Sequence, residues 1–285
     1  MSRIIFVSDT LTILNRYRSN LIGAVAKKHK TEQYSVISLS GLRSIIPPWN
    51  RVIVASNLKT NLFVAVFCTT KTLFILNGLG RYQESRVLRA LLIRIINRRK
   101  RSHFAIQSYR DYRYFRKLVT IADNISWIPG SGGTRRAIGT SKSIIFVSRA
   151  SKYPIFRNKV ALFSAQGNHV NIVGVEGKNS NSVHYMGYQE QHQLFLTGSK
   201  FLALSGYGEG IPHSLVDAIV SGMCITIERR LYIDAGFYNY DNCYTKSNID
   251  GLQLYDVSKW DDRLIENISI NHVTYKYTNL VEGLI

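Results

Sequence analysis

The feature that most constrains the fold is a regular alternation of short apolar runs with longer segments of helical periodicity. Residues 3–7, 51–55 and 72–76 are short runs dominated by aliphatic, often β-branched, side chains. Such runs are typical of strands that are buried on both faces of a parallel sheet. Between the first two runs, residues 11–30 carry apolar side chains at close to helical spacing, which predicts a helix. Strands that alternate with helices indicate an α/β fold with parallel sheets.

The same alternation lies on both sides of one Gly- and Ser-rich segment, PGSGGTRRAIGTSK at residues 129–142. Before this segment we predict further strands at 34–39, 104–107 and 125–128, and helices at 85–101 and 109–118. After it we predict strands at 143–147, 170–173, 201–204 and 224–227, and a helix at 212–221. Because a hinge-like segment separates the two sets, we expect two α/β domains, 1–140 and 141–285. The last helix is expected either in the second domain or packed back on the first.

The cysteine content and the first residues of the chain indicate the cellular compartment of the protein. Cys68, Cys224 and Cys243 show no C-x-x-C spacing, so neither a zinc cage nor a disulfide framework is predicted. The start, MSRIIFVSDT, lacks the apolar stretch of a signal peptide. The longest apolar run, residues 62–68, is far shorter than the ~20 residues that cross a bilayer. We therefore expect a cytoplasmic protein without a membrane-spanning helix.

The net charge of the chain indicates which classes of molecule it attracts. Lys and Arg number 37 against 18 Asp and Glu, a formal net charge of +19 among 285 residues. A balance of this kind attracts anions, which include nucleic acid, acidic membrane surfaces and phosphorylated substrates.

Over half of the positive excess lies between residues 81 and 117, where twelve Lys and Arg stand against two acidic residues. The helix predicted at 85–101 carries an apolar stripe flanked by arginines, and we expect the stripe to face the domain core. The basic segment as a whole favours contact with anionic lipid. Tyr109, Tyr112 and Tyr114 interleave with arginines, so base stacking in a nucleic-acid-binding protein remains an alternative.

The most informative stretch for chemistry is LSGYGEGIPHSLVDAIVSGMCITI at residues 204–227, which follows the strand predicted at 201–204. This strand enters a Gly-rich loop that holds Glu209, and a helix begins at Pro212. Ligands of α/β sheets bind at the carboxyl ends of strands, and the first turn of a helix attracts anions. Glu209 and Asp217 are eight residues apart and flank the helix start, which suits an elongated ligand such as a nucleotide sugar. The residues alone predict an anion site.

The segment EGIPHSLVDAIVSGMCI at 209–225 resembles the donor-site motif of retaining glycosyltransferases of family 4, which has two acidic residues eight apart. Four other segments resemble motifs of this family and occur in its order: NGLGR at 77–81, WIPGSGG at 127–133, IIFVSRASK at 144–152 and VHYMGY at 183–188. The resemblance extends over most of the chain, and the conjunction of motifs in order is more specific than any one of them.

This resemblance implies the GT-B fold, two Rossmann-like domains with parallel sheets that face each other across a cleft. The first domain would take the acceptor and the second the nucleotide sugar. Glu209 would hold hydroxyls of the donor sugar, Asp217 the ribose, and Arg149 would neutralise the diphosphate that leaves. The resemblance also implies donor contacts from the following residues: Lys152, Gly210, Ile211, His213 and Ser214. Lys159 is the alternative to Lys152 as the second phosphate cation.

On the acceptor side, the resemblance implies roles for Asn77 and Gly78. No metal and no other cofactor is expected, because cationic side chains supply the counter-charge. The function implied is retaining transfer of a sugar, from UDP-hexose or UDP-HexNAc, to a lipid-linked saccharide in capsule or O-antigen synthesis. The enzyme would contact the inner face of the cell membrane peripherally. A UDP-sugar epimerase of the same fold is a further alternative.

Overall fold

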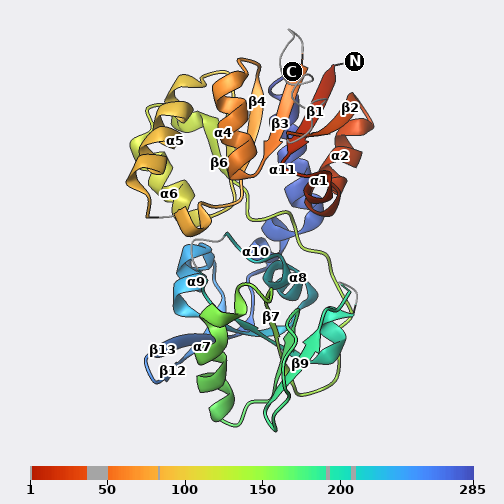
Figure 1. Ribbon diagram of the computed structural model, residues 1–285, viewed down its shortest axis with the longest axis vertical. Coiled ribbons are helices and arrows are strands. Elements are labelled where there is room, and N and C mark those ends of the chain that lie inside the picture. The colour runs from red at the N-terminus through yellow and green to blue at the C-terminus, as the bar shows by residue number, and fades with distance from the viewer. Residues whose placement is uncertain (1, 37–50, 83, 191–192, 207–209) are drawn as a thin grey trace. The chain divides into compact units, whose positions relative to one another are not determined.

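A computed structural model of the chain describes residues 2–36, 51–82, 84–190, 193–206 and 210–285 (Figure 1). Its contacts divide the described residues into two units. Unit 1 consists of Met1–Gly132, Gly210 and Ile270–Ile285, and unit 2 of Gly133–Gly206 and Ile211–Ser269. The sequence places the boundary at 140, whereas contacts with the first unit end at Gly132, and the final helix packs with that unit.

Unit 1 is built on a six-stranded parallel sheet. In spatial order its strands are β2 (Lys30–Ser35), β1 (Arg3–Ser8), β3 (Arg51–Ser56), β4 (Thr72–Leu76), β5 (His103–Ile106) and β6 (Ile125–Trp127). The chain runs outward from β1 in one direction to β2 and in the other to β3. The order of the strands therefore reverses beside β1, at the position where α/β sheets commonly bind ligands.

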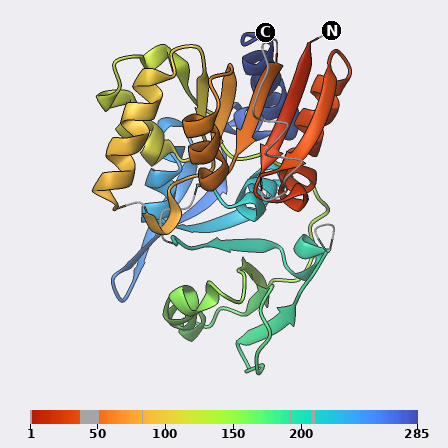
Figure 2. The same ribbon diagram turned by 45° about the horizontal axis from the view of Figure 1, so that its top comes forward.

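Helices cover both faces of this sheet (Figures 1 and 2). They are α1 (Leu11–Tyr17), α2 (Ser19–Ala26), α4 (Leu58–Phe67), α5 (Arg86–Arg98), α6 (Tyr109–Leu118) and α11 (Ile270–Glu282). Alternate residues of β1 enter two separate cores: Ile5 and Val7 pack with α4, α5 and α6, while Ile4 and Phe6 pack with α1, α2 and α11. Successive side chains of a strand point to opposite faces of the sheet, and here both faces pack into a core. The sequences of these strands are therefore uninterrupted apolar runs.

Unit 2 has a seven-stranded sheet with one antiparallel edge. In spatial order the strands are β12 (Cys243–Ile249), β13 (Leu252–Lys259), β11 (Cys224–Glu228), β10 (Lys200–Ala203), β7 (Ile144–Val147), β8 (Val170–Val173) and β9 (Val183–Gly187). Its helices are α7 (Tyr153–Ala165), α8 (His213–Ser221), α9 (Arg229–Asp234) and α10 (Asp262–Ile268). β7 to β11 are parallel, and only β13 and β12 run against their neighbours.

The structure also contains helices that were not predicted, α4, α7, α9 and α10, and three further differences from the predicted elements have a local cause. The helix predicted over 11–30 is two helices, because the chain breaks its helical path at Arg18. The second strand begins at Lys30 rather than at 34, and residues 37–39 lie outside the described part of the chain. The β12–β13 hairpin was not predicted, although Asp250–Gly251 is a strong turn signal and both residues have positive φ, 46° and 84°.

No helix within the described residues is both long enough and apolar enough to span a bilayer.

His103 gives unit 1 a dependence on pH. His103 is the first residue of β5, and its Nε2 lies 2.8 Å from the Ser126 hydroxyl. Burial lowers the pKa of the His103 ring to about 4. The unfolded chain, with an ordinary histidine pKa near 6.5, therefore binds more protons between pH 6.5 and 4, and stability falls as the pH is lowered through this window. We expect wild type to lose about 2 kcal/mol more than His103→Gln between pH 7 and 4.5. Urea unfolding at the two pH values measures this difference, and equal losses in both proteins would contradict the assignment.

Candidate functional site

The first cluster of candidate residues lies at the carboxyl end of β7 in unit 2. Arg149 follows this strand by two residues, and its side chain is exposed. The Arg149 carbonyl accepts hydrogen bonds from the backbone N–H groups of Lys152 and Tyr153, at 2.9 and 3.0 Å, which turns the chain into α7. Burial, with repulsion from Arg149, lowers the pKa of Lys152. Two cations therefore share one turn, and their combined potential favours an anion there.

Lys159, the alternative to Lys152, has a different environment. Its ammonium group donates to both carboxylate oxygens of Glu228, at 2.9 and 2.8 Å. Glu228 ends β11 and also accepts the backbone N–H of Ser205, which follows β10, at 2.8 Å. This ion pair joins α7 to the carboxyl ends of two neighbouring strands. Lys159 thus neutralises a buried carboxylate, whereas Lys152 lies beside Arg149.

The helix start predicted to bind anions is present in α8. Pro212 is its N-cap, and no side chain among the described residues caps its first turn. Proline suits this position because its φ is already close to the helical value. Ile211 is buried and packs in the core of unit 2, while His213 and Ser214 are half-buried at the first turn. The helix ends at Gly222, whose φ of 81° needs a glycine. An uncapped first turn offers backbone N–H groups and the positive end of the helix dipole to an anion.

Asp217 is almost completely buried, with 6% of its side chain exposed. One carboxylate oxygen accepts the backbone N–H of Thr134 at 2.8 Å. The other lies 3.5 Å from Nε of Arg136 and 3.9 Å from Nε2 of His213. Asp217 therefore holds the segment that enters unit 2 against α8. Binding of ribose by this carboxylate stays a prediction.

The glycines of the WIPGSGG segment explain why that segment reaches α8. A Cβ on Gly133 would lie 2.8 Å from the side chain and the carbonyl oxygen of Val216, so only glycine fits there. The Gly133 N–H donates to the carbonyl of Ile268 at 2.7 Å, which fixes the segment from its other side.

The predicted acceptor-side residues lie at the carboxyl end of β4 in unit 1. Asn77 and Gly78 begin a turn in which Gly78 has a φ of 129°. The Leu79 N–H of this turn donates to the buried Asp111 carboxylate at 3.1 Å. Gly210 lies against the same turn, where a Cβ would be 2.5 Å from the carbonyl oxygen of Asn77. The structure thus groups Gly210 with Asn77, and the other predicted donor residues with unit 2; Glu209 lies outside the described residues.

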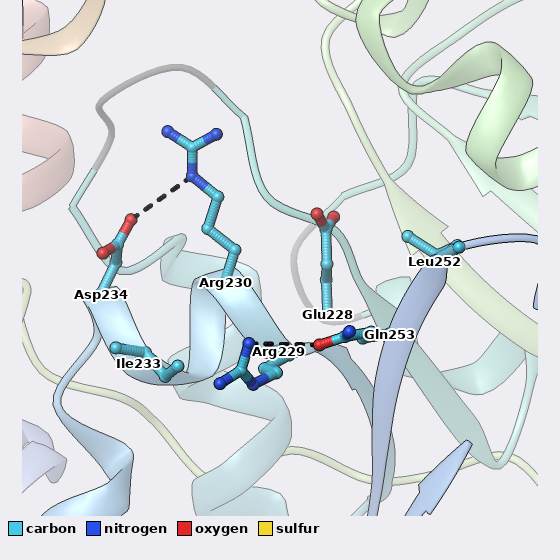
Figure 3. Close-up of a pocket in the computed structure, with 8 residues that line it drawn as sticks. Glu228, Arg229, Arg230, Ile233, Asp234, Leu252 and Gln253 are labelled. Atoms are coloured by element: carbon cyan, nitrogen blue, oxygen red, sulfur yellow. Dashed lines mark hydrogen bonds and ion pairs between the residues drawn. The ribbon is translucent and has the colours of Figure 1, made fainter. Parts of the chain in front are cut away.

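A cavity of about 320 Å³ lies beside the carboxyl end of β11, between the start of α9 and the β12–β13 turn (Figure 3). It is lined by Glu228, Arg229, Arg230, Ile233, Asp234, Gly251, Leu252 and Gln253. Arg230 forms an ion pair with Asp234 at 3.8 Å, and Arg229 donates to Gln253 at 3.2 Å. Sequence reasoning missed these residues, although three consecutive charges directly after a buried strand are a signal for such an edge.

The aromatic residues that suggested base stacking are engaged within unit 1. Tyr109 packs edge-on against Trp127 with ring centroids 4.8 Å apart. Tyr112 accepts a hydrogen bond from Arg116, and the guanidinium of Arg89 lies over Tyr114 at 4.5 Å. These contacts disfavour a stacking surface for bases. No cluster of three or more metal-ligating side chains occurs within the described ranges.

Comparison with known proteins finds solved structures with a similar fold. The chain matches no protein-family model and no curated protein sequence. TarM has a TM-score of 0.54 with this structure at 12% sequence identity, over 83% of this chain and 51% of TarM, so this chain spans about half the length of TarM. The Anabaena protein Alr3699/HepE, crystallised with UDP and glucose, has a TM-score of 0.54 at 11% identity, over 79% of this chain and 80% of HepE. Its complex with UDP-glucose has the same TM-score at 13% identity and the same coverage.

At these identities the likeness is one of fold. In this chain each unit has a core of parallel strands with helices packed on both faces. The predicted fold class, two Rossmann-like α/β domains, is therefore confirmed.

The environment of Asp217 predicts a cost in stability when it is removed. Asp217→Ala removes the acceptor of the Thr134 N–H and the buried carboxylate that pairs with Arg136, and we expect it to lower stability by about 2–4 kcal/mol. Asp217→Asn keeps an acceptor for Thr134 and should cost about half as much. Thermal unfolding measures both, with the exposed Asp123→Ala as control. A melting temperature of Asp217→Ala equal to that of the control would contradict the structural role.

Proposed function

We propose that the protein is a glycosyltransferase that takes its sugar from a nucleotide sugar. The observation that carries this proposal is the paired cation turn of Arg149 and Lys152 at the carboxyl end of β7, in a unit whose helix α8 has an uncapped start. A diphosphate needs cations and free backbone N–H groups of this kind. The order of the family-4 motifs supports the same reading. So does the shared fold with HepE, which was crystallised with UDP-glucose.

In the proposed mechanism, the Arg149 guanidinium and the first turn of α8 stabilise negative charge that develops on the β-phosphate of the leaving group. Glu209 holds the sugar hydroxyls and so fixes the anomeric carbon relative to the acceptor. The leaving phosphate helps to take the acceptor proton on the same face, so the anomeric configuration is retained. The positive side chains supply the counter-charge, and we propose that no divalent metal is required.

We further propose that the donor is a UDP-hexose or UDP-HexNAc. The acceptor is a lipid-linked saccharide of capsule or O-antigen type, reached at the inner face of the membrane. The exposed residues of α5, of the turn after it and of α6 support the proposed contact with the membrane. The apolar stripe of α5 faces the core only in part: Leu92, Ile95 and Ile96 are buried as expected, whereas Val87 and Leu91 of the same stripe are not. Val87 and Leu91 are 80% and 42% exposed. Exposed cations lie on α5, on the turn after it and on α6: Arg86, Arg94, Arg98, Lys100, Arg101, Arg113, Arg116 and Lys117.

Donor binding and turnover test the proposal directly. We expect UDP to raise the melting temperature equally with and without a chelator of divalent metals. Glu209→Ala should abolish transfer of the sugar without loss of folding, and Arg149→Ala should lower kcat by roughly 10²-fold because a fixed charge at the leaving group is lost.

The matched control for Arg149→Ala is Arg157→Ala, which removes an exposed arginine of α7 in the same unit. Full transfer activity in Glu209→Ala would remove the assignment of the donor site. Stabilisation by UDP only when a divalent metal is added would argue for a different class of enzyme.

Membrane contact is tested separately with lipid vesicles. The double variant Arg94→Glu/Arg98→Glu reverses two exposed charges on α5. Because each cation near an anionic surface contributes about 1 kcal/mol, we expect its affinity for phosphatidylserine-containing vesicles to fall at least 30-fold. Co-sedimentation at low and high salt measures this, with Arg157→Glu of unit 2 as control. Equal binding by the double variant and the control would contradict a lipid-facing role for α5.

A further inference from the structure

Arg18 is a buried cation that the proposed mechanism does not use. It lies at the junction of α1 and α2, and only 2% of the residue is exposed. Its guanidinium donates to the hydroxyls of Ser56 and Ser131, at 3.2 and 2.9 Å. It also donates to the side-chain oxygen of Asn77 at 3.0 Å and to the carbonyl of Tyr17 at 3.1 Å. All four acceptors are neutral.

No Asp or Glu of the described chain lies within ion-pair distance of Arg18. The ring of Tyr277 lies 5.7 Å from its guanidinium carbon and stabilises the charge in part. Burial lowers the pKa of the Arg18 guanidinium, because it removes the charged group from water. Buried charges are usually paired. With four of its five N–H groups used, one N–H of Nη2 has no acceptor in the described structure.

The position of Arg18 in the sheet points to a ligand. Ser56 ends β3 and Asn77 directly follows β4, so the guanidinium lies under the carboxyl ends of central strands. This edge includes the reversal of strand order between β1 and β3. Ligands of open α/β sheets bind at such a reversal.

A chain of hydrogen bonds leads from Arg18 along this edge. Because Arg18 donates a hydrogen bond to the side-chain oxygen of Asn77, the NH2 group of Asn77 is directed to the side-chain oxygen of Asn57, to which it donates at 2.9 Å. Asn57 in turn donates to the Ser8 hydroxyl at 3.2 Å. The cation therefore fixes the direction of both amides, and each amide retains one further N–H. The half-buried Asn57 and Asn77 thus present donors at the edge.

Asn57 also has a strained backbone. Its φ is 78°, a conformation that is costly for a residue other than glycine. The strain is tolerated because the Asn57 side chain closes the network between Asn77 and Ser8. Strain of this kind concentrates at sites that bind or react.

We propose that Arg18, Asn77 and Asn57 form a phosphate-binding site in unit 1 and that its ligand is a phosphate group of the acceptor. An oxyanion supplies what the described residues around Arg18 do not provide, a negative charge and acceptors for the remaining N–H groups of Arg18 and the two amides. The identification of the ligand as acceptor rests on the proposed function, whereas the phosphate site itself does not. The donor diphosphate is the other possible source of the same chemistry.

Calorimetric titration of the full chain with inorganic pyrophosphate, geranyl diphosphate and UDP tests the site. In the Arg149→Ala background, where the unit 2 anion site is weakened, we expect pyrophosphate and geranyl diphosphate still to bind. Adding Arg18→Met should weaken both at least tenfold. The matched control is Arg16→Met, which removes an exposed arginine from the same helix. Unchanged pyrophosphate affinity in Arg18→Met would overturn the site.

A second variant keeps the test independent of the folding of Arg18→Met. Asn57→Gly tolerates the positive φ and removes the amide. Relief of the backbone strain opposes the loss of two hydrogen bonds and the greater entropy of the unfolded chain, so we expect the variant to fold while its affinity for pyrophosphate falls at least threefold. Unchanged affinity for pyrophosphate in the folded variant would mean that the Asn57 amide takes no part in binding, which overturns the site.

UDP binding to single variants distinguishes the two sources of phosphate. We expect Arg18→Met alone to bind UDP as wild type does. Loss of UDP binding in this variant would assign the phosphate to the donor and overturn the acceptor. Arg18-dependent binding of pyrophosphate in a protein that does not bind UDP would support the site while the proposed function fails.

Discussion

Parallel pairing of the central strands is the constraint on which the candidate sites of both units depend. Because neighbouring strands run in the same direction, all their carboxyl ends lie at one edge, and polar residues directly after them are brought together. In unit 2 this unites residues as distant in sequence as Ser205 and Glu228, and in unit 1 Ser56 and Asn77. The register cannot slip, since a shift by one residue would exchange the apolar faces that fill two separate cores.

This constraint explains how much of the fold could be predicted from the sequence. Strands buried on both faces must be apolar throughout, so β1, β3, β4 and β7 are visible as short aliphatic runs, and their order with helices indicates parallel sheets. β12 fails this test because its residues are almost all exposed, and its sequence, CYTKSNI, carries no apolar run. The turn at Asp250–Gly251 and the alternating apolar residues of β13 were the signals for the hairpin, and they were not enough without an apolar run in β12.

The candidate sites were predictable where a single local segment forms them. A loop that ends in a proline-started helix is local, so the start of α8 and the arginine after β7 could be found. Pairing across the sheet is not local: Lys159 and Glu228 are 69 residues apart, and nothing in either segment shows that the lysine is neutralised. Arg18 was missed for a related reason, since an arginine within a helical pattern is ordinarily assigned to the solvent face.

The two units therefore treat a partly or wholly buried cation in opposite ways. In unit 2, Lys159 forms an ion pair with Glu228 of the same unit, and this pair holds α7 to the edge of the sheet. Among the described residues of unit 1, the groups that accept hydrogen bonds from Arg18 are neutral oxygens, and two amides are oriented from it. A fold that needed Arg18 only for cohesion would gain more from an acidic partner or from an apolar side chain of similar size. A cation that is buried, pre-oriented and uncompensated has a use when its counter-charge arrives with a ligand, and the carboxyl edge of the sheet is where a ligand arrives.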